Sequence, residues 1–258
     1  MFIKNYVDKK DYNNNGYIVL DTNLIDNSNF NNLVNQINDC LKTELKKNNY
    51  LKKMGGSIMG NLNINQGPFA SKLYSLVFQE QFINIFEDLT KTKLELFDIN
   101  HCGNLALPKK GKQLFHIDGN YKKKMYLITI VTENIDLKNG PTEVCVGSHK
   151  KQMSYWEFFF SKKTKKKLIL NKGQIVIRKH NLWHRGTENK SDTPRLLLSF
   201  SLTPKESNIK PQKLSSHIEI LPNFFKSSFI GRLHEYFYAN FGYVIIILKL
   251  IKSIIKRE

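Results

Sequence analysis

The stretch GQIVIRKHNLWHRGTENKSDTPRLLLSFSL (173–202) contains two β-rich segments on either side of a polar connection. GQIVIR (173–178) follows a Lys-Gly turn, and RLLLSFSL (195–202) is largely apolar. Short runs of branched and aromatic residues bounded by turn residues predict strands. His184 lies after the first strand and before the second, so the connection can carry it back over the mouth of a sheet.

A second histidine lies upstream in QLFHIDGN (113–120), where His116 and Asp118 are separated by one residue. Side chains at positions i and i+2 of an extended segment point to the same face, so these two would project together. An H-x-D pattern is common by chance, and a turn or strand end explains it equally well. Together with His184, however, it would form a facial triad of two histidines and one carboxylate, which suits non-haem Fe(II).

The order of the remaining segments indicates the fold class. GYIVLD (16–21) predicts a strand, and the stretches 29–47 and 72–90 predict helices, the first of them amphipathic. Further strands are expected at KLELFDIN (93–100) and KMYLITIVT (124–132). Helices followed by many strands with Gly, Pro and Asn turns predict a mainly β chain with flanking helices, as an antiparallel sandwich or barrel.

Composition limits the partners and the compartment. The 258 residues carry a formal net charge of +18, which favours anionic small molecules, membrane surfaces or nucleic acid, although a solvated lysine surface explains it as well. No nucleic-acid-binding motif is visible, so nucleic acid is not expected. Three widely spaced cysteines, Cys40, Cys102 and Cys145, favour a reducing, cytoplasmic setting over a disulfide framework. The first residues show no apolar segment typical of a secretory signal.

The segment from about residue 206 differs from the rest of the chain. It begins as a polar linker with Pro204 and Pro211 and ends in an apolar run, 236–248, that is shorter than the roughly 18–20 residues needed to span a bilayer. We therefore expect a domain at 1–205 and a basic tail at 206–258. Lys249, Lys252 and Lys256 cluster on one side of a helical wheel, which indicates peripheral membrane contact through 232–258 or docking on the domain or a partner.

Arg195 begins an otherwise apolar strand, eleven residues after His184. Alone it would be interpreted as an arginine at the surface end of a strand. A guanidinium that points into a barrel needs an anion, however, and a dicarboxylate bound to the metal at one end would offer its far carboxylate to that planar fork.

Three stretches in this order resemble the phytanoyl-CoA dioxygenase family of Fe(II)/2-oxoglutarate-dependent oxygenases. They are QLFHID (113–118), KKKMYLITIVTENIDLKNGPTEVCVGSHK (122–150) and GQIVIRKHNLWHRGTENKSDTPR (173–195). YNNNGYIVLDTNLI (12–25) is similar to the family's opening strand, so the resemblance covers roughly residues 10 to 203. One departure is Val146, where the family usually has proline before G-S-H.

The resemblance implies a double-stranded β-helix (jelly roll, cupin-like) with Fe(II) at His116, Asp118 and His184. It implies that 2-oxoglutarate binds the iron and Arg195, and that a substrate is hydroxylated by O2 with release of succinate and CO2. Gln113 and Asn189 are further candidates, Gln113 for orienting a ligand and Asn189, with Thr187, for shaping the co-substrate pocket. Turn formation explains the segment around Asn189 equally well.

Other interpretations remain open. A zinc hydrolase could use the same three ligands around a metal-bound water, but it gives Arg195 no task. A catalytically silent jelly-roll protein held at a membrane or partner by its tail is a third possibility. The other histidines are interpreted as structural or solvated, with His149 a hydrogen-bonding group and His180 part of a loop. The basic charge and the amphipathic tail favour a small anionic or lipid-linked substrate without identifying it.

Overall fold

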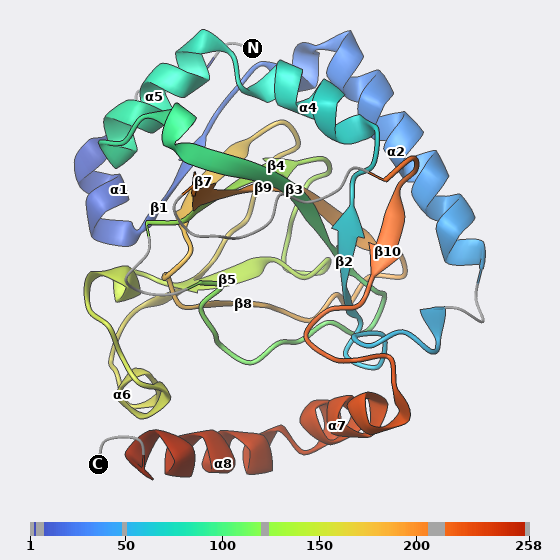
Figure 1. The fold of residues 1–258 in the computed structure, drawn as a ribbon, viewed down its shortest axis with the longest axis vertical. Coiled ribbons are helices and arrows are strands. Elements are labelled where there is room, and N and C mark those ends of the chain that lie inside the picture. The colour runs from blue at the N-terminus through green and yellow to red at the C-terminus, as the bar shows by residue number, and fades with distance from the viewer. Residues whose placement is uncertain (1–2, 4–7, 48–50, 120–123, 206–214, 256–258) are drawn as a thin grey trace.

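The computed structural model describes residues 3, 8–47, 51–119, 124–205 and 215–255 (Figure 1). Its centre is a seven-stranded sheet in the order β1-β7-β4-β9-β3-β2-β10, and a second sheet has the order β6-β5-β8. All pairings between these described strands are antiparallel. The strands are β1 (Tyr17–Leu20), β2 (Asn61–Asn65), β3 (Phe97–Ala106), β4 (Tyr126–Val131), β5 (Thr142–Cys145), β6 (Lys165–Lys167), β7 (Ile175–Lys179), β8 (His184–Gly186), β9 (Arg195–Pro204) and β10 (Glu219–Leu221).

The helices between residues 9 and 90 cover the outer face of the large sheet, and the small sheet lies on its other side (Figure 1). The helices are α1 (Lys9–Asn15), α2 (Ser28–Lys46), α4 (Phe69–Val77), α5 (Glu80–Thr90), α6 (Tyr155–Phe159), α7 (Phe229–Asn240) and α8 (Gly242–Ile255). The core joins the apolar faces of α2, α4 and α5 to β4, β7 and β9. The strand β9 is buried along most of its length because it lies between β4 and β3 inside the sheet.

Most of the expected elements are confirmed. The strand expected at 16–21 is β1, and those expected at 124–132, 173–178 and 195–202 are β4, β7 and β9. The amphipathic helix expected at 29–47 is α2, whose buried residues are Phe30, Leu33, Val34, Ile37 and Leu41.

Two expectations about local structure are wrong. The stretch 72–90 is not one helix, because α4 ends at Val77 and α5 begins at Glu80. The break lets the ring of Phe78 pack edge-on against Phe82 and Phe200, while Gln79 adopts an extended conformation. The strand expected from residue 93 begins only at Phe97, because Leu94–Leu96 forms a turn of 3₁₀-helix.

The C-terminal segment folds back onto the barrel. β10 pairs with β2 at the edge of the large sheet, and α7 and α8 cross the open end of the two sheets (Figure 1). The apolar run 236–248 is divided between these two helices at Phe241. No described helix combines the length and the apolar character that crossing a bilayer requires. The division into 1–205 and 206–258 stays a prediction.

Candidate metal centre

A short antiparallel bridge positions the two histidines of the expected triad. His116 and His184 each donate the backbone N–H to the other's carbonyl, with N–O distances of 3.0 and 2.9 Å. The backbone N–H of Asp118 then donates to the carbonyl of His180 at 3.0 Å. The extended segment that contains His116 therefore runs alongside the connection between β7 and β8. Asp118, two residues after His116, is hydrogen-bonded to the same connection.

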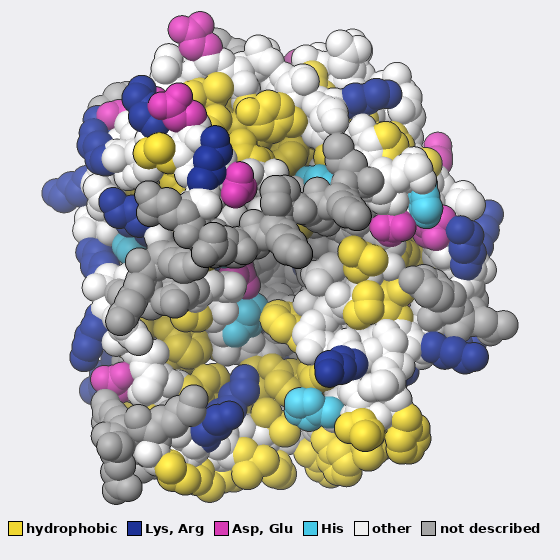
Figure 2. Space-filling model, in the orientation of Figure 1, with side chains coloured by type: hydrophobic (Ala, Val, Ile, Leu, Met, Phe, Trp, Pro, Cys, Tyr) yellow, Lys and Arg dark blue, Asp and Glu magenta, His cyan; other side chains and the backbone are white. Residues whose placement is uncertain are grey.

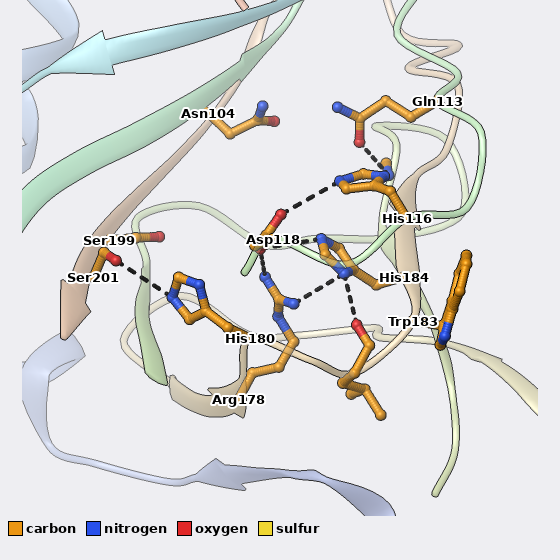
Figure 3. A network of polar contacts seen from close by, with 12 residues as sticks. Asn104, Gln113, His116, Asp118, Arg178, His180, Trp183, His184, Ser199 and Ser201 are labelled. Carbon is orange, nitrogen blue, oxygen red and sulfur yellow. Dashed lines mark hydrogen bonds and ion pairs between the residues drawn. The ribbon is translucent and has the colours of Figure 1, made fainter. Parts of the chain in front are cut away.

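The side chains of His116, Asp118 and His184 point toward one another (Figure 3). His116 Nε2 lies 3.4 Å from Asp118 Oδ1, and His184 Nε2 lies 3.3 Å from Asp118 Oδ2. One ligand atom from each residue lies within 4.8 Å of the others, a spacing that could hold one metal ion. The structure thus brings together the three residues expected to bind metal.

Hydrogen bonds on the far side of each ring favour ligation through Nε2. His116 Nδ1 lies 2.9 Å from the carbonyl of Leu114, and His184 Nδ1 lies 2.9 Å from that of Leu182. A proton on Nδ1 that is donated to a carbonyl leaves the lone pair on Nε2, which is the tautomer a metal needs.

Arg178, from β7, lies beside this cluster with a side chain that is 7% exposed. Its Nη2 donates to Asp118 Oδ2 at 2.6 Å, and its Nη1 lies 2.9 Å from His184 Nδ1. His184 Nδ1 can accept from Arg178 or donate to Leu182, and only the second arrangement frees Nε2. The ion pair between Arg178 and Asp118 makes Arg178 the counter-ion of this carboxylate in the metal-free protein.

The protonation states suit a divalent cation. Burial alone would raise the pKa of Asp118, but the neighbouring His184 and Arg178 hold it well below its usual value. Burial and then the charge of Arg178 lower the pKa of His184 to about 4. An ionised carboxylate and a neutral imidazole therefore face the same point at neutral pH, as Fe(II) or Zn(II) requires.

The triad lines a cavity of about 290 Å³ that also contains Arg195. Arg195 is 1% exposed; its Nη1 donates to Asn104 Oδ1 at 3.1 Å and its Nη2 to the carbonyl of Gly140 at 2.9 Å. Its Nε has no partner among the described residues. Burial lowers the pKa of Arg195 to about 10, with Glu133 opposing that effect, so the guanidinium stays charged at neutral pH. A buried cation with a free donor suits an anionic ligand in this cavity.

Gln113 and Asn189, the two further candidate site residues, differ in their position relative to the cavity. Gln113 lines the cavity, and its Oε1 accepts the backbone N–H of Gly186 at 2.7 Å, which steadies the strand that carries His184. Asn189 is not among the described residues that line the cavity. Its amide donates to the carbonyls of Ala106 and Thr193 at 3.0 and 2.8 Å, so this side chain fixes the connection before β9.

The neighbouring histidines lie outside the cluster. His180 occupies a turn, and its Nε2 lies 3.3 Å from Ser201 Oγ. His149 Nε2 lies 3.1 Å from the carbonyl of Asn13, so it ties the segment after β5 to α1.

Sequence reasoning missed Arg178 and Asn104 as cavity residues. A signal for Arg178 was present, because Val176 and Arg178 alternate along one strand and both line the cavity. A charged residue at the inward position of an apolar strand could have been identified by that alternation. Asn104, on β3, reaches the cavity only through sheet pairing, so its sequence neighbourhood held no comparable signal.

Comparisons with known proteins agree with this geometry. The family model for phytanoyl-CoA dioxygenase (PhyH) matches residues 99–197, a range that includes the triad and Arg195. No curated protein sequence matches the chain.

Among solved structures, AviO1 from Streptomyces viridochromogenes Tue57 is 12% identical, with a TM-score of 0.56 over 79% of this chain and 96% of that one. The non-heme alpha ketoglutarate dependent carbocyclase SnoK from nogalamycin biosynthesis is 13% identical, with a TM-score of 0.56 over 83% and 95%. EctD from S. alaskensis with bound Fe is 12% identical, with a TM-score of 0.55 over 79% and 78%. These similarities confirm the expected jelly-roll fold.

We expect Arg178→Met to destabilise the metal-free protein by roughly 1–3 kcal/mol, because Asp118 loses its charged partner. Saturating Fe(II) under anaerobic conditions should remove most of that deficit, since the metal replaces the guanidinium as counter-ion. Urea unfolding with and without Fe(II) measures both quantities.

Arg185→Met is the matched control, because Arg185 pairs with Glu143 at 2.6 Å outside the triad. Its deficit should persist when Fe(II) is added. Equal rescue of both variants would show that Fe(II) does not act at Asp118.

Proposed function

We propose that the chain, whose residues 99–197 match the phytanoyl-CoA dioxygenase family model, is a member of that family and acts as a non-haem Fe(II)/2-oxoglutarate-dependent dioxygenase. The observation that carries the proposal is one cavity that holds both a His-Asp-His cluster and a buried, incompletely bonded arginine. His116, Asp118 and His184 would hold Fe(II), and Arg195 would bind the far carboxylate of 2-oxoglutarate.

The iron would supply adjacent positions for 2-oxoglutarate and O2 and the oxidising power for substrate. In the net reaction one oxygen atom enters the substrate as a hydroxyl group and the other enters succinate, while 2-oxoglutarate loses CO2. Asp118 would supply negative charge to the metal. Arg178 donates a hydrogen bond to one carboxylate oxygen of Asp118 and thereby fixes the orientation of that carboxylate.

Similar folds with related cofactors support the proposal. The epimerase SnoN was solved in complex with Fe3+ and alpha ketoglutarate, at 11% identity and a TM-score of 0.56. A zinc hydrolase would use the same three ligands but would leave the buried cation Arg195 without a ligand, so the oxygenase is favoured.

We infer that the substrate is small and anionic or lipid-linked, and that this cytoplasmic enzyme contacts membranes through 232–258. Support comes from the outer faces of α7 and α8, where hydrophobic side chains gather along the lower edge of the molecule (Figure 2). Tyr243 is 86% exposed, Phe229 82% and Ile247 54%. An exposed apolar surface of this kind is typical of an interaction site.

Charge favours an anionic bilayer over a second copy of the chain as the occupant of this surface. The sequence from 236 to 255 contains Lys249 and Lys252 and no acidic residue, and the whole chain carries +18. Two such chains repel each other, whereas an anionic lipid surface attracts them.

We expect anaerobic addition of 2-oxoglutarate to the Fe(II)-loaded protein to produce a visible charge-transfer band, which decays on exposure to O2 as succinate forms. Asp118→Ala should abolish the band and the succinate, because two histidines alone hold Fe(II) poorly. Absorption spectroscopy and succinate quantification measure this. Full activity in Asp118→Ala would overturn the assignment, and iron binding without a band in wild type would favour the zinc hydrolase.

For Arg195→Ala we expect the 2-oxoglutarate requirement to rise by roughly 30-fold or more, the effect of losing a buried charged partner. Fe(II) affinity should be largely retained, because Arg195 does not contact the triad ligands. Titration of the band with 2-oxoglutarate, after circular dichroism has verified folding, tests this. An unchanged requirement would mean that another cation binds the co-substrate.

We expect the full chain to co-sediment with phosphatidylcholine vesicles that contain phosphatidylglycerol, and less with phosphatidylcholine alone. Ile247→Glu should weaken binding roughly tenfold or more, because it removes the burial of a large apolar side chain. Leu96→Glu is the matched control, since Leu96 is also 54% exposed but lies before β3. Vesicle binding unaffected by Ile247→Glu, with loss of a dimer in its place, would identify this face as a self-association surface.

A further inference from the structure

A second cavity, here called the tail cavity, lies between the C-terminal helices and the barrel and measures about 490 Å³. This volume falls within the roughly 300–1,000 Å³ typical of small-molecule sites. The C-terminal helices contribute His234, Tyr238, Ile245, Leu248, Lys249 and Lys252 to its wall. Gln113, His116 and Phe224 line both this cavity and the one that holds the triad. A molecule in the tail cavity would therefore lie next to a candidate metal ligand.

Polar contacts hold α7 in place and so fix the shape of the tail cavity. Glu235 is fully buried, and its Oε1 accepts the backbone N–H groups of Ile58 and Met59 at 2.7 and 2.8 Å. Arg232 Nη1 donates to the carbonyl of Met54 at 2.6 Å and to Ser57 Oγ at 2.7 Å. A carboxylate that satisfies two backbone donors is costly to remove, so α7 is an integral wall of the cavity.

The electrostatics of the tail cavity favour an anion. Lys249 Nζ lies 5.1 Å from the ring centroid of Tyr155 and 5.6 Å from that of Tyr238, which places the ammonium between two aromatic rings. Burial lowers the pKa of Lys249, and no carboxylate of the described chain forms an ion pair with it. None of the described residues lining the cavity is acidic. A half-buried ammonium without a carboxylate is stabilised when an anion binds.

Phe224 marks the passage between the two cavities. Its backbone has φ of +57°, a left-handed conformation that costs a bulky residue roughly 1–2 kcal/mol. Its ring lies 5.2 Å from the ring of His116, in edge-to-face orientation, although the residue is 65% exposed. An exposed phenylalanine held in a strained conformation beside a metal ligand is well placed to contact a bound substrate.

We propose that the tail cavity is the substrate site of the proposed oxygenase and that its ligand is an anionic amphiphile. The apolar chain or ring of the ligand packs against Tyr238, Ile245 and Leu248, and its phosphate or carboxylate binds the ammonium of Lys249. The carbon to be oxidised passes Phe224 to reach the triad. The apolar outer face of α8 belongs to the same helix as this wall, so a ligand drawn from a lipid surface has a short path to the cavity.

The first test is equilibrium binding of dodecyl phosphate to the full-length, metal-free chain by calorimetry, below the concentration at which the probe forms micelles. Dodecyl maltoside, which has the same chain but no charge, should bind more weakly. Lys249→Met should weaken dodecyl phosphate binding about tenfold to a hundredfold, the effect of losing a charged hydrogen bond. It should leave dodecyl maltoside binding unchanged.

Lys46→Met, which removes an exposed lysine of α2, is the matched control and should behave as wild type. Equal binding of the two dodecyl probes, or equal effects of the two lysine variants, would each overturn the proposal. These binding measurements use no iron, so a negative result would not argue against the oxygenase assignment. Conversely, absence of the charge-transfer band would not affect the binding results.

The second test connects the tail cavity to the triad. Dodecyl phosphate should shift the charge-transfer band of the protein loaded with Fe(II) and 2-oxoglutarate, because the probe would lie beside His116. At the same probe concentration the band of Lys249→Met should shift less. A probe that binds the wild-type protein without changing the band would show that the tail cavity is not the substrate site.

Discussion

Two backbone hydrogen bonds between His116 and His184 set the geometry on which the candidate metal centre depends. Each residue bonds to the other's carbonyl, at 3.0 and 2.9 Å, and the two imidazole rings come to lie 4.4 Å apart between centroids. The same ladder continues to Asp118, whose N–H bonds to the carbonyl of His180 at 3.0 Å. Because side chains alternate along an extended chain, a slip of one residue would turn both His116 and Asp118 away from His184.

The two arginines of the metal cavity are held in different ways. Arg178 is paired directly with the carboxylate of Asp118, so its charge is compensated within the protein. Arg195 is more deeply buried, yet its hydrogen bonds go to a side-chain amide and a backbone carbonyl, which are neutral. Glu133 acts on Arg195 through its charge but forms no ion pair with it among the described residues. Burying a charge without a directly paired opposite charge is costly, and the cost falls when an anion binds. This difference in pairing fits a supporting role for Arg178 and a ligand-binding role for Arg195.

The sequence predicted those parts of the molecule that local pattern decides. β7 and β9 follow from their apolar residues and turns, and the joint position of His116 and Asp118 follows from a spacing of two on an extended segment. The break between α4 and α5 could not be predicted, because it depends on Phe78 packing against Phe200 in a distant strand. The docking of α7 depends on Glu235 meeting backbone groups of Ile58 and Met59, which are 177 and 176 residues away.

The helix α8 reverses the usual arrangement of an amphipathic helix on a protein surface. Such a helix normally turns its apolar stripe to the core and its lysines to water. In α8, Val244, Ile247 and Ile251 are 52%, 54% and 48% exposed, whereas Lys249 points between two tyrosine rings at the tail cavity. Water outside would leave the apolar face exposed, and the half-buried ammonium of Lys249 would lack an opposite charge. An anionic lipid surface outside and an anionic ligand inside would satisfy both faces at once, and one helix would then connect the source of the substrate to its site.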